Sequence, residues 1–131
     1  MIEELLDKIS ESDTPDPKAN LDLAIQKYLG MKIPDKVMLS SKSMGCYGKR
    51  SSGGIVVDID TARKEHPAFI AGVIYHEYYH NVLTKQKVRS ADQESRVRYK
   101  TKIWASLEAG KYKEDPEALA AFKKVISLSG Q

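Results

Sequence analysis

The sequence has little cysteine and no long apolar run, and both absences narrow what the protein can be. A single cysteine, Cys46, excludes a disulfide within the 131 residues. The longest apolar run, residues 67–75, is too short to span a bilayer. The first residues, 1–4, are acidic and lack the basic-then-apolar order of a signal peptide. We therefore expect a cytoplasmic protein without a membrane partner, in which Cys46 is a buried structural thiol.

A large excess of charge of one sign is also missing. The formal net charge is +3, and the length predicts a single domain over residues 1–131 with one hydrophobic core. The charge is uneven, however, because the stretch from Lys85 to Lys102 holds seven cations against only Asp92 and Glu94. A solvated helix face is the simpler interpretation of this basic stretch. Attraction of nucleic acid or an acidic substrate is the alternative.

Apolar spacing predicts N-terminal helices within residues 1–30, one over 1–9 and one over 18–29, separated by a loop over 10–17. Gly30 is a suitable stop for the second helix. The sheet is expected within residues 31–60. Its strands are predicted at 31–40, interrupted by a turn, at 44–49, and at 55–59, with a turn over 50–54. Short strands joined by tight turns indicate a three-stranded, mostly antiparallel sheet.

Helical spacing returns after residue 66. A central, largely buried helix is predicted over 67–84, and Pro67 suits its first turn. Ser90 and Gln93 form a capping-box pattern at the start of a helix over 90–108. The apolar members of that helix are Val97, Ile103, Trp104 and Leu107. A last helix is expected over 116–129. This order of elements is typical of an α+β fold.

Histidine is scarce, yet two of the three histidines stand four residues apart on the predicted 67–84 helix, in His76-Glu77-Tyr78-Tyr79-His80. Residues at this spacing share a helix face, so both imidazoles can bind one Zn²⁺. Glu77 is placed to act as general base on a water held by that metal. Burying these three polar residues without a partner would be costly, which favours a metal site. The remaining histidine, His66, is expected in a surface loop.

A catalytic zinc needs a third protein ligand, and no histidine follows His80. The candidates are Asp92 and Glu94, near the start of the next helix. We favour Glu94 because it shares a helix face with Val97 and Thr101. Asp92 remains the alternative, although an acid at a helix start is also favoured by the helix dipole alone.

The stretch from Met44 to Trp104 resembles the zincin metallopeptidases. A glycine-containing turn, the strand 55–59, the helix with the H-E-Y-Y-H motif and a helix with an acidic residue follow in that order. The resemblance implies a compact zincin-like fold with His76 and His80 as zinc ligands and Glu77 as the base. It also implies Glu94 as the third ligand of the glutamate branch, the gluzincins. In the family, the strand equivalent to 55–59 is the sheet edge that binds an extended peptide.

Within the zincins, the compactness is most similar to the minigluzincins, and the strand–helix order also resembles SprT-like and ImmA/IrrE-type proteins. SprT-like proteins use a third histidine that is missing here. Many gluzincins continue as E-x-x-A-D/N after the ligand glutamate. Ser95-Arg96 fall in the last two slots only when counted from Asp92, which keeps Asp92 open as a ligand.

The sequence therefore predicts a zinc-dependent metallopeptidase, most simply an endopeptidase, that acts on a protein or peptide substrate. The alternative is a non-catalytic or latent zincin-like module that binds protein or nucleic acid through the basic stretch. The segment 111–131 is expected to pack as a helix, and a cover over the cleft is its second interpretation.

Overall fold

The computed structural model describes residues 16–51 and 54–129, and within them it contains five α-helices and one three-stranded sheet. The α+β class expected from the sequence is confirmed. The predicted helix over 1–9 and most of the predicted loop over 10–17 lie outside the described residues.

The N-terminal helix begins as α2 (Pro17–Leu23), capped by the Asp16 side chain. It continues as one π-helical turn, η1 (Ala24–Tyr28), in which backbone hydrogen bonds span five residues instead of four. The helix ends after this turn. Gly30 follows with a φ of 76°, a conformation that favours glycine. The helix predicted over 18–29 is therefore confirmed, with Pro17 as its first residue rather than as part of the loop.

The sheet is formed by β1 (Lys36–Leu39), β2 (Gly48–Ser51) and β3 (Gly54–Val57), in the order β1-β3-β2. β3 pairs antiparallel with β2 but parallel with β1, so the sheet is mixed rather than mostly antiparallel. The reason is the strand order: β3, the last strand in the chain, lies between β1 and β2 and pairs with each of them in a different direction. The strand predicted at 44–49 is displaced, because β2 occupies part of the predicted turn at 50–54.

β3 ends at Val57 because Asp58 begins a short helix, α3 (Ile59–Lys64), that the sequence analysis did not predict. The buried Asp58 carboxylate accepts hydrogen bonds from the Thr61 backbone N–H at 3.0 Å and the Thr61 hydroxyl at 2.9 Å. Burial alone would raise the pKa of Asp58, but the hydrogen bonds from Met44 and Thr61 outweigh it and lower the pKa. Asp58 is thus a helix cap and not a strand residue.

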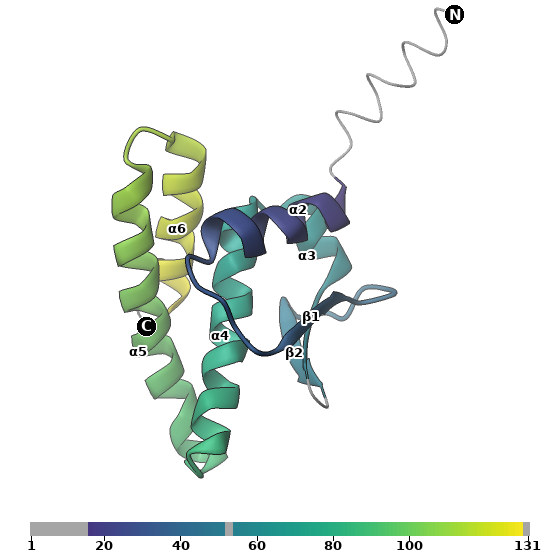
Figure 1. The fold of residues 1–131 in the computed structure, drawn as a ribbon, viewed down its shortest axis with the longest axis vertical. Helices are drawn as coiled ribbons and strands as arrows, with labels where there is room; N and C mark the ends of the chain where they lie inside the picture. Colours follow the sequence, from purple (N-terminus) through teal and green to yellow (C-terminus); the bar gives the residue numbers. More distant parts are fainter. Residues whose placement is uncertain (1–15, 52–53, 130–131) are drawn as a thin grey trace, which may run out of the picture.

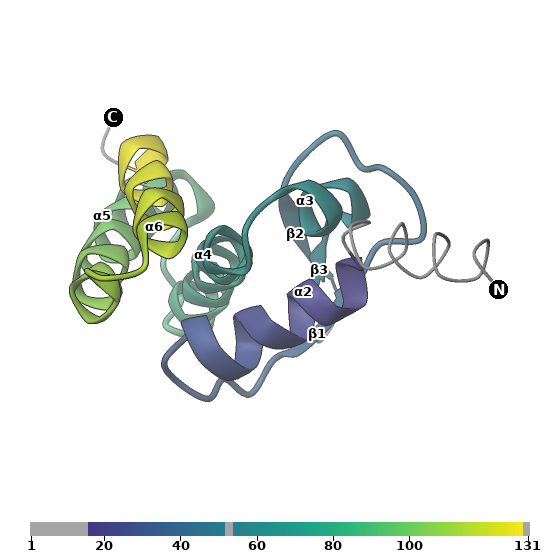
Figure 2. The same cartoon turned by 90° about the horizontal axis from the view of Figure 1, so that it is seen from above.

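α4 (Pro67–Lys85) is the central element. Figures 1 and 2 show it between the sheet with α2 and α3 on one side and the neighbouring helices α5 (Ser90–Ala109) and α6 (Pro116–Ser129) on the other. A 3-10 turn, η2 (Gly110–Tyr112), leads from α5 towards α6. The three predicted C-terminal helices are confirmed to within one residue at each end. Among the described residues, no helix has the length and apolarity needed to cross a membrane.

Two expectations about α5 are wrong. Ser90 and Gln93 do not form a capping box, because the Gln93 side chain is 2% exposed and is bound by groups of α4 and the α4–α5 connection. Ile103 and Leu107 also leave the core, with 39% and 68% of their surface exposed, whereas Trp104 is buried. The apolar residues of α5 lie on two sides of the helix, so not all of them can face α4 and α6.

Candidate metal centre

His76, His80 and Glu94 come together where the later turns of α4 meet the first turns of α5. The Glu94 Oε2 atom lies 2.9 Å from His80 Nε2, and Oε1 lies 3.5 Å from His76 Nε2. One ligand atom from each residue falls within 4.8 Å of the others, so the group could hold a metal ion. Around a tetrahedral Zn²⁺, ligand atoms are roughly 3.3 Å apart, which is the scale of these separations.

Asp92, the alternative third ligand, lies outside this cluster. Its carboxylate instead accepts a hydrogen bond from Arg89 Nε at 3.1 Å. Position within α5 explains the difference, because residues two apart on a helix point about 200° apart around its axis. Of the two acids, Glu94 is the one on the side that faces α4.

The tight connection between α4 and α5 creates the site. The Val88 N–H donates to the Leu83 carbonyl and the Lys87 N–H to the Thr84 carbonyl, a pattern that ends α4 abruptly. Lys87 has a φ of 62°, which is uncommon for a residue with a side chain. This turn reverses the chain within a few residues, so the start of α5 returns past His80.

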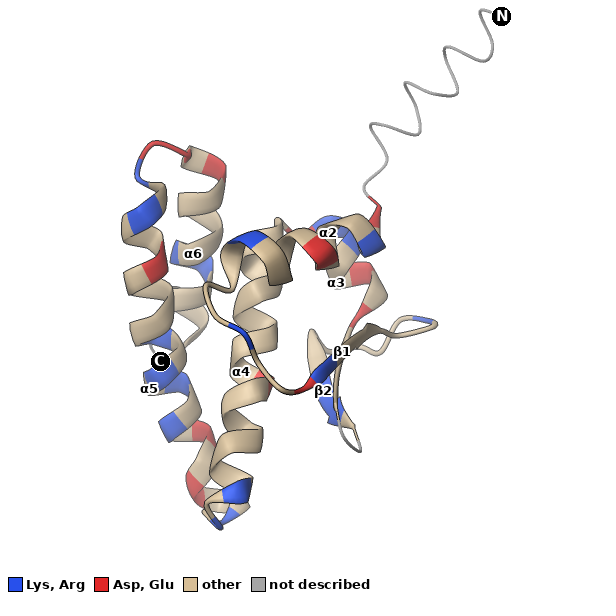
Figure 3. Cartoon of the chain, in the orientation of Figure 1, with Lys and Arg blue, Asp and Glu red and all other residues tan. Residues whose placement is uncertain are grey.

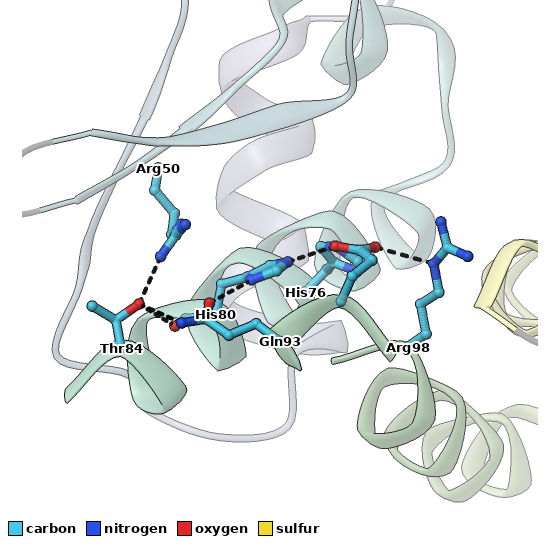
Figure 4. Close-up of polar contacts among 7 residues, drawn as sticks. Arg50, His76, His80, Thr84, Gln93 and Arg98 are labelled. Atoms are coloured by element: carbon cyan, nitrogen blue, oxygen red, sulfur yellow. Dashed lines mark hydrogen bonds and ion pairs between the residues drawn. The ribbon is translucent and has the colours of Figure 1, made fainter. Parts of the chain in front are cut away.

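Gln93 holds the ring of His80, a role that sequence analysis missed. The Gln93 Nε2 group donates to the Val88 carbonyl at 2.8 Å and to Thr84 Oγ1 at 3.2 Å, which fixes Oε1 as the atom facing His80. Oε1 lies 3.0 Å from His80 Nδ1 and accepts a hydrogen bond from the Nδ1–H group (Figure 4). A metal-binding histidine needs such an acceptor on its other nitrogen. The sequence offered one hint of this role: Gln93 can accept a hydrogen bond and stands directly before Glu94, the predicted third ligand.

The hydrogen bond between Gln93 and His80 limits what can lie between His80 Nε2 and the Glu94 carboxylate. With its proton on Nδ1, a neutral His80 presents an unprotonated Nε2 to the Glu94 carboxylate, which also only accepts. Two acceptors 2.9 Å apart require a proton or a cation between them. A metal ion would satisfy this requirement and would also be within reach of His76, so the three residues fit a divalent metal.

Thr84 ties the site to the sheet. Its hydroxyl donates to the His80 carbonyl at 2.9 Å and accepts hydrogen bonds from Gln93 and from Arg50, the latter at 2.9 Å. Arg50 belongs to β2, and Figure 4 shows its side chain reaching towards Thr84. These contacts therefore link β2, α4 and α5 around His80.

The charge states of the ligands suit metal binding. Burial lowers the pKa of His76, with His80 and Arg98 acting in the same direction against the opposite effect of Glu94. Burial alone would raise the pKa of Glu94, but the attraction of His76 in its protonated form and the hydrogen bonds from Arg98 and His80 outweigh it and lower the pKa. A neutral imidazole and an ionised carboxylate are the forms that bind metals.

A cavity of about 360 Å³ opens beside the cluster, lined in part by His76, Glu77 and Glu94. Burial raises the pKa of Glu77; Glu94 adds to this effect, whereas His80 and Arg50 oppose it. Gly48 of β2 also lines the cavity, and a Cβ at Gly48 would lie 2.7 Å from Val73 Cγ1. The absence of a side chain at Gly48 therefore lets β2 approach α4 beside Glu77.

The sheet edge next to the site is β2, which corrects the expectation for strand 55–59. β3, which covers most of that strand, is the central strand and pairs on both sides, so it cannot accept a peptide by edge pairing. β2 pairs only with β3 among the described residues. It is therefore the strand with an open side close to the cavity.

Two further expectations need correction. Cys46 is exposed rather than buried, and it contributes to the wall of the cavity. His66 is half-buried rather than a surface loop residue, because it is the N-cap of α4 and its Nδ1 accepts a hydrogen bond from the Ala68 N–H at 3.0 Å. Its ring also packs edge-on against Tyr28.

Comparison of the chain with protein-family models, with curated proteins and with solved structures found no significant match. The function of the site must therefore be inferred from its own geometry. Two imidazoles and one carboxylate lie close enough to share a metal ion, next to a cavity that the half-buried Glu77 also lines.

Proposed function

We propose that this chain is a zinc-dependent peptidase of the zincin type, glutamate branch. The supporting observation is the meeting of His76, His80 and Glu94, contributed by two helices, beside a cavity. Two histidines and one carboxylate are the protein ligands of one class of catalytic zinc site, which leaves a coordination position open. Nitrogen and carboxylate donors in this number also suit zinc better than Mg²⁺ or Ca²⁺.

Glu77 would be the general base. A zinc ion bound here would lower the pKa of a water molecule and polarise the substrate carbonyl. Glu77, one residue after the proposed ligand His76, would accept a proton from that water and would deliver it to the departing amine. Its raised pKa favours this exchange, because a base works best when its pKa is close to the ambient pH.

The surroundings of the site suit an extended peptide. β2 has an open edge on the side away from β3, and a peptide strand can pair with such an edge. Gly48 and Tyr47 bring this region to the rim of the cavity. Peptide main chain along β2 and one side chain in the cavity would bring a scissile bond near the metal ligands.

A Glu77→Gln variant tests the catalytic proposal. The substitution keeps the shape of the side chain, and Glu77 is not a proposed ligand, so zinc content should stay near one ion per chain. Cleavage of an unfolded protein substrate should fall by at least about 100-fold, the lower range for loss of acid–base catalysis. The matched control is Glu117→Gln, an exposed glutamate at the start of α6 that should leave cleavage unchanged. Undiminished cleavage by the Glu77→Gln protein would refute the assigned base.

Exposed cations on α5 favour a second candidate function, binding of nucleic acid without catalysis. Arg96, Lys100 and Lys102 are exposed and form no ion pair within residues 16–51 and 54–129. Figure 3 shows the cations along the middle of α5. The test is duplex DNA binding at increasing salt, where affinity should fall steeply, and a Lys100→Glu variant should bind more weakly. Absence of binding at low salt would exclude this function.

A further inference from the structure

The cavity beside the metal ligands has one cationic wall residue among those described, Arg98. Its Nε donates to Glu94 Oε1 at 3.0 Å, which leaves its two terminal NH₂ groups without a hydrogen bond to any described residue. In Figure 4 the Arg98 guanidinium lies beyond this contact, on the side away from His80. The Arg98 side chain is 46% exposed, so ligand atoms can reach it. A guanidinium with two free NH₂ groups is suited to bind a carboxylate through paired hydrogen bonds.

The rest of the cavity is mainly apolar. Phe69 and Val73 come from α4, and Val125 and Leu128 come from α6. A volume of about 360 Å³ is near the lower limit for ligand pockets, so it suits one large side chain better than a long segment. The apolar walls and Arg98 together match an apolar residue that also carries a carboxylate.

Thr101 supports a ligand with polar atoms in this position. It lies one helical turn after Arg98 and lines the same cavity. It is 1% exposed, and its hydroxyl has no hydrogen-bond partner in the described structure. A buried hydroxyl without a partner is unfavourable, so a polar ligand atom that reached it would stabilise the complex.

Arg98 and the metal ligand His76 lie on opposite sides of a single carboxylate group, a spacing that suits one peptide residue. One carboxylate, that of Glu94, lies between them, with Oε1 at 3.5 Å from His76 Nε2 and 3.0 Å from Arg98 Nε. Successive carbonyl carbons of an extended peptide are roughly 3.5 Å apart. When the scissile carbonyl lies at the metal ligands, the next carboxyl group along the chain is therefore within range of Arg98.

We propose that Arg98 binds the C-terminal carboxylate of a peptide whose last, apolar side chain fills the cavity. This inference rests on the proposed peptidase function and replaces the expected endopeptidase preference by cleavage at the last peptide bond. Water adds across that bond, which releases a free amino acid and leaves a peptide shortened by one residue with a new carboxylate. Arg98 selects the substrate, whereas Glu77 transfers the proton.

Binding of N-acetylphenylalanine and its uncharged amide tests the inference without requiring activity. Metal-free protein is titrated with each compound by NMR, so that zinc cannot bind the carboxylate directly. We expect the acid to bind at least about tenfold more tightly than the amide, given the strength of hydrogen bonds between charged groups. Arg98→Gln should remove the preference, and Arg98→Lys, which keeps the charge without the paired geometry, should retain only part of it. The control Arg96→Gln, on the exposed side of α5, should retain the full preference.

Equal binding of acid and amide by the wild-type protein would overturn the inference, as would no binding of either, or an unchanged preference in Arg98→Gln. Circular dichroism verifies the fold of each variant. Zinc content and peptide cleavage are measured separately. A protein that prefers the acid but cleaves no peptide would keep the carboxylate site and refute the proposed function. A protein that cleaves amidated peptides as fast as free-acid peptides would keep the function and refute the role of Arg98.

Discussion

The Nδ1 atom of His80 lies 3.0 Å from the amide oxygen of Gln93, a side chain that is only 2% exposed. The two NH bonds of the Gln93 amide are used by Val88 and Thr84, so the amide cannot turn over without losing both contacts. His80 is consequently held in one orientation and one tautomer, with Nε2 available to a metal.

Replacing Gln93 with Met should therefore weaken zinc binding by about 10–100-fold, because His80 loses the acceptor that orients it. Competition with a chromophoric chelator measures the affinity. Gln26→Met, at an exposed position, serves as the control and should bind zinc like the wild type. Unchanged affinity in the Gln93 variant would show that His80 does not depend on this hydrogen bond.

Glu94 and Asp92 should differ sharply as zinc ligands. Glu94→Ala removes the carboxylate that faces both histidines, so purified protein should hold far less than one zinc per chain. Asp92→Ala removes only an exposed pair with Arg89 and should leave zinc content unchanged. Elemental analysis after dialysis measures both. The opposite result would make Asp92 the ligand.

Gly72 of α4 should be intolerant of a side chain because α6 packs directly on it. A Cβ at Gly72 would lie 2.6 Å from Val125 Cγ2, an overlap that requires the two helices to move. We expect Gly72→Ala to lower the free energy of unfolding by about 1–3 kcal/mol, although alanine is otherwise the better helix former. Urea denaturation measures this change.

A double variant separates this overlap from general damage. Gly72→Ala combined with Val125→Ala should be more stable than the sum of the single changes predicts, because the shortened side chain makes room for the new methyl group. Gly110→Ala is the control, since a Cβ there meets no atom within 4 Å, and its stability should be unchanged or higher. Strict additivity of Gly72 and Val125 would contradict the direct contact.

His66 should make stability depend on pH. Burial lowers its pKa, opposed by Asp115 and Glu117 and reinforced by Lys27, and its Nδ1 caps α4 only when unprotonated. The unfolded chain then binds more protons than the folded chain, so the stabilisation is present above the ordinary histidine pKa of about 6.5 and is lost as the pH falls below it. His66→Asn keeps an N-cap side chain that does not titrate.

The wild type should therefore lose more stability than His66→Asn between pH 7.5 and 5.5. Thermal unfolding of both proteins with the metal removed measures the difference. Parallel stability curves for the two proteins would mean that protonation of His66 does not oppose folding.

Local patterns in the sequence were sufficient for most helices and for the histidine pair. The apolar residues of α4 cover much of its surface, and Pro67 marks its start, so both its position and its burial could be predicted. The i, i+4 spacing of His76 and His80 needs no tertiary information, because one helical turn brings them together. The helix face of Glu94 favoured it over Asp92 as the third ligand. In the structure Glu94 lies with the two histidines, whereas Asp92 pairs with Arg89.

The errors have a common origin in long-range packing. Ser90 and Gln93 match a local capping pattern, yet Gln93 is bound by α4 and its connection to α5. Ile103 and Leu107 are apolar and were therefore expected in the core. Both are exposed, because α6 packs on a different side of α5. The strand over 55–59 was expected at the sheet edge from the resemblance to the zincins, but it lies between the other two strands, and the order of strands in a sheet cannot be read from their order in the chain.

By itself, then, the sequence determined which residues could bind a metal and where the helix that carries two of them begins and ends. Only the tertiary structure decided that Glu94 reaches both histidines, that Gln93 orients His80, that β2 is the open edge and that Arg98 borders the cavity. The physical reason is the range of the interactions. Helix periodicity depends on neighbours within a turn, whereas each of these contacts depends on how two separate elements pack.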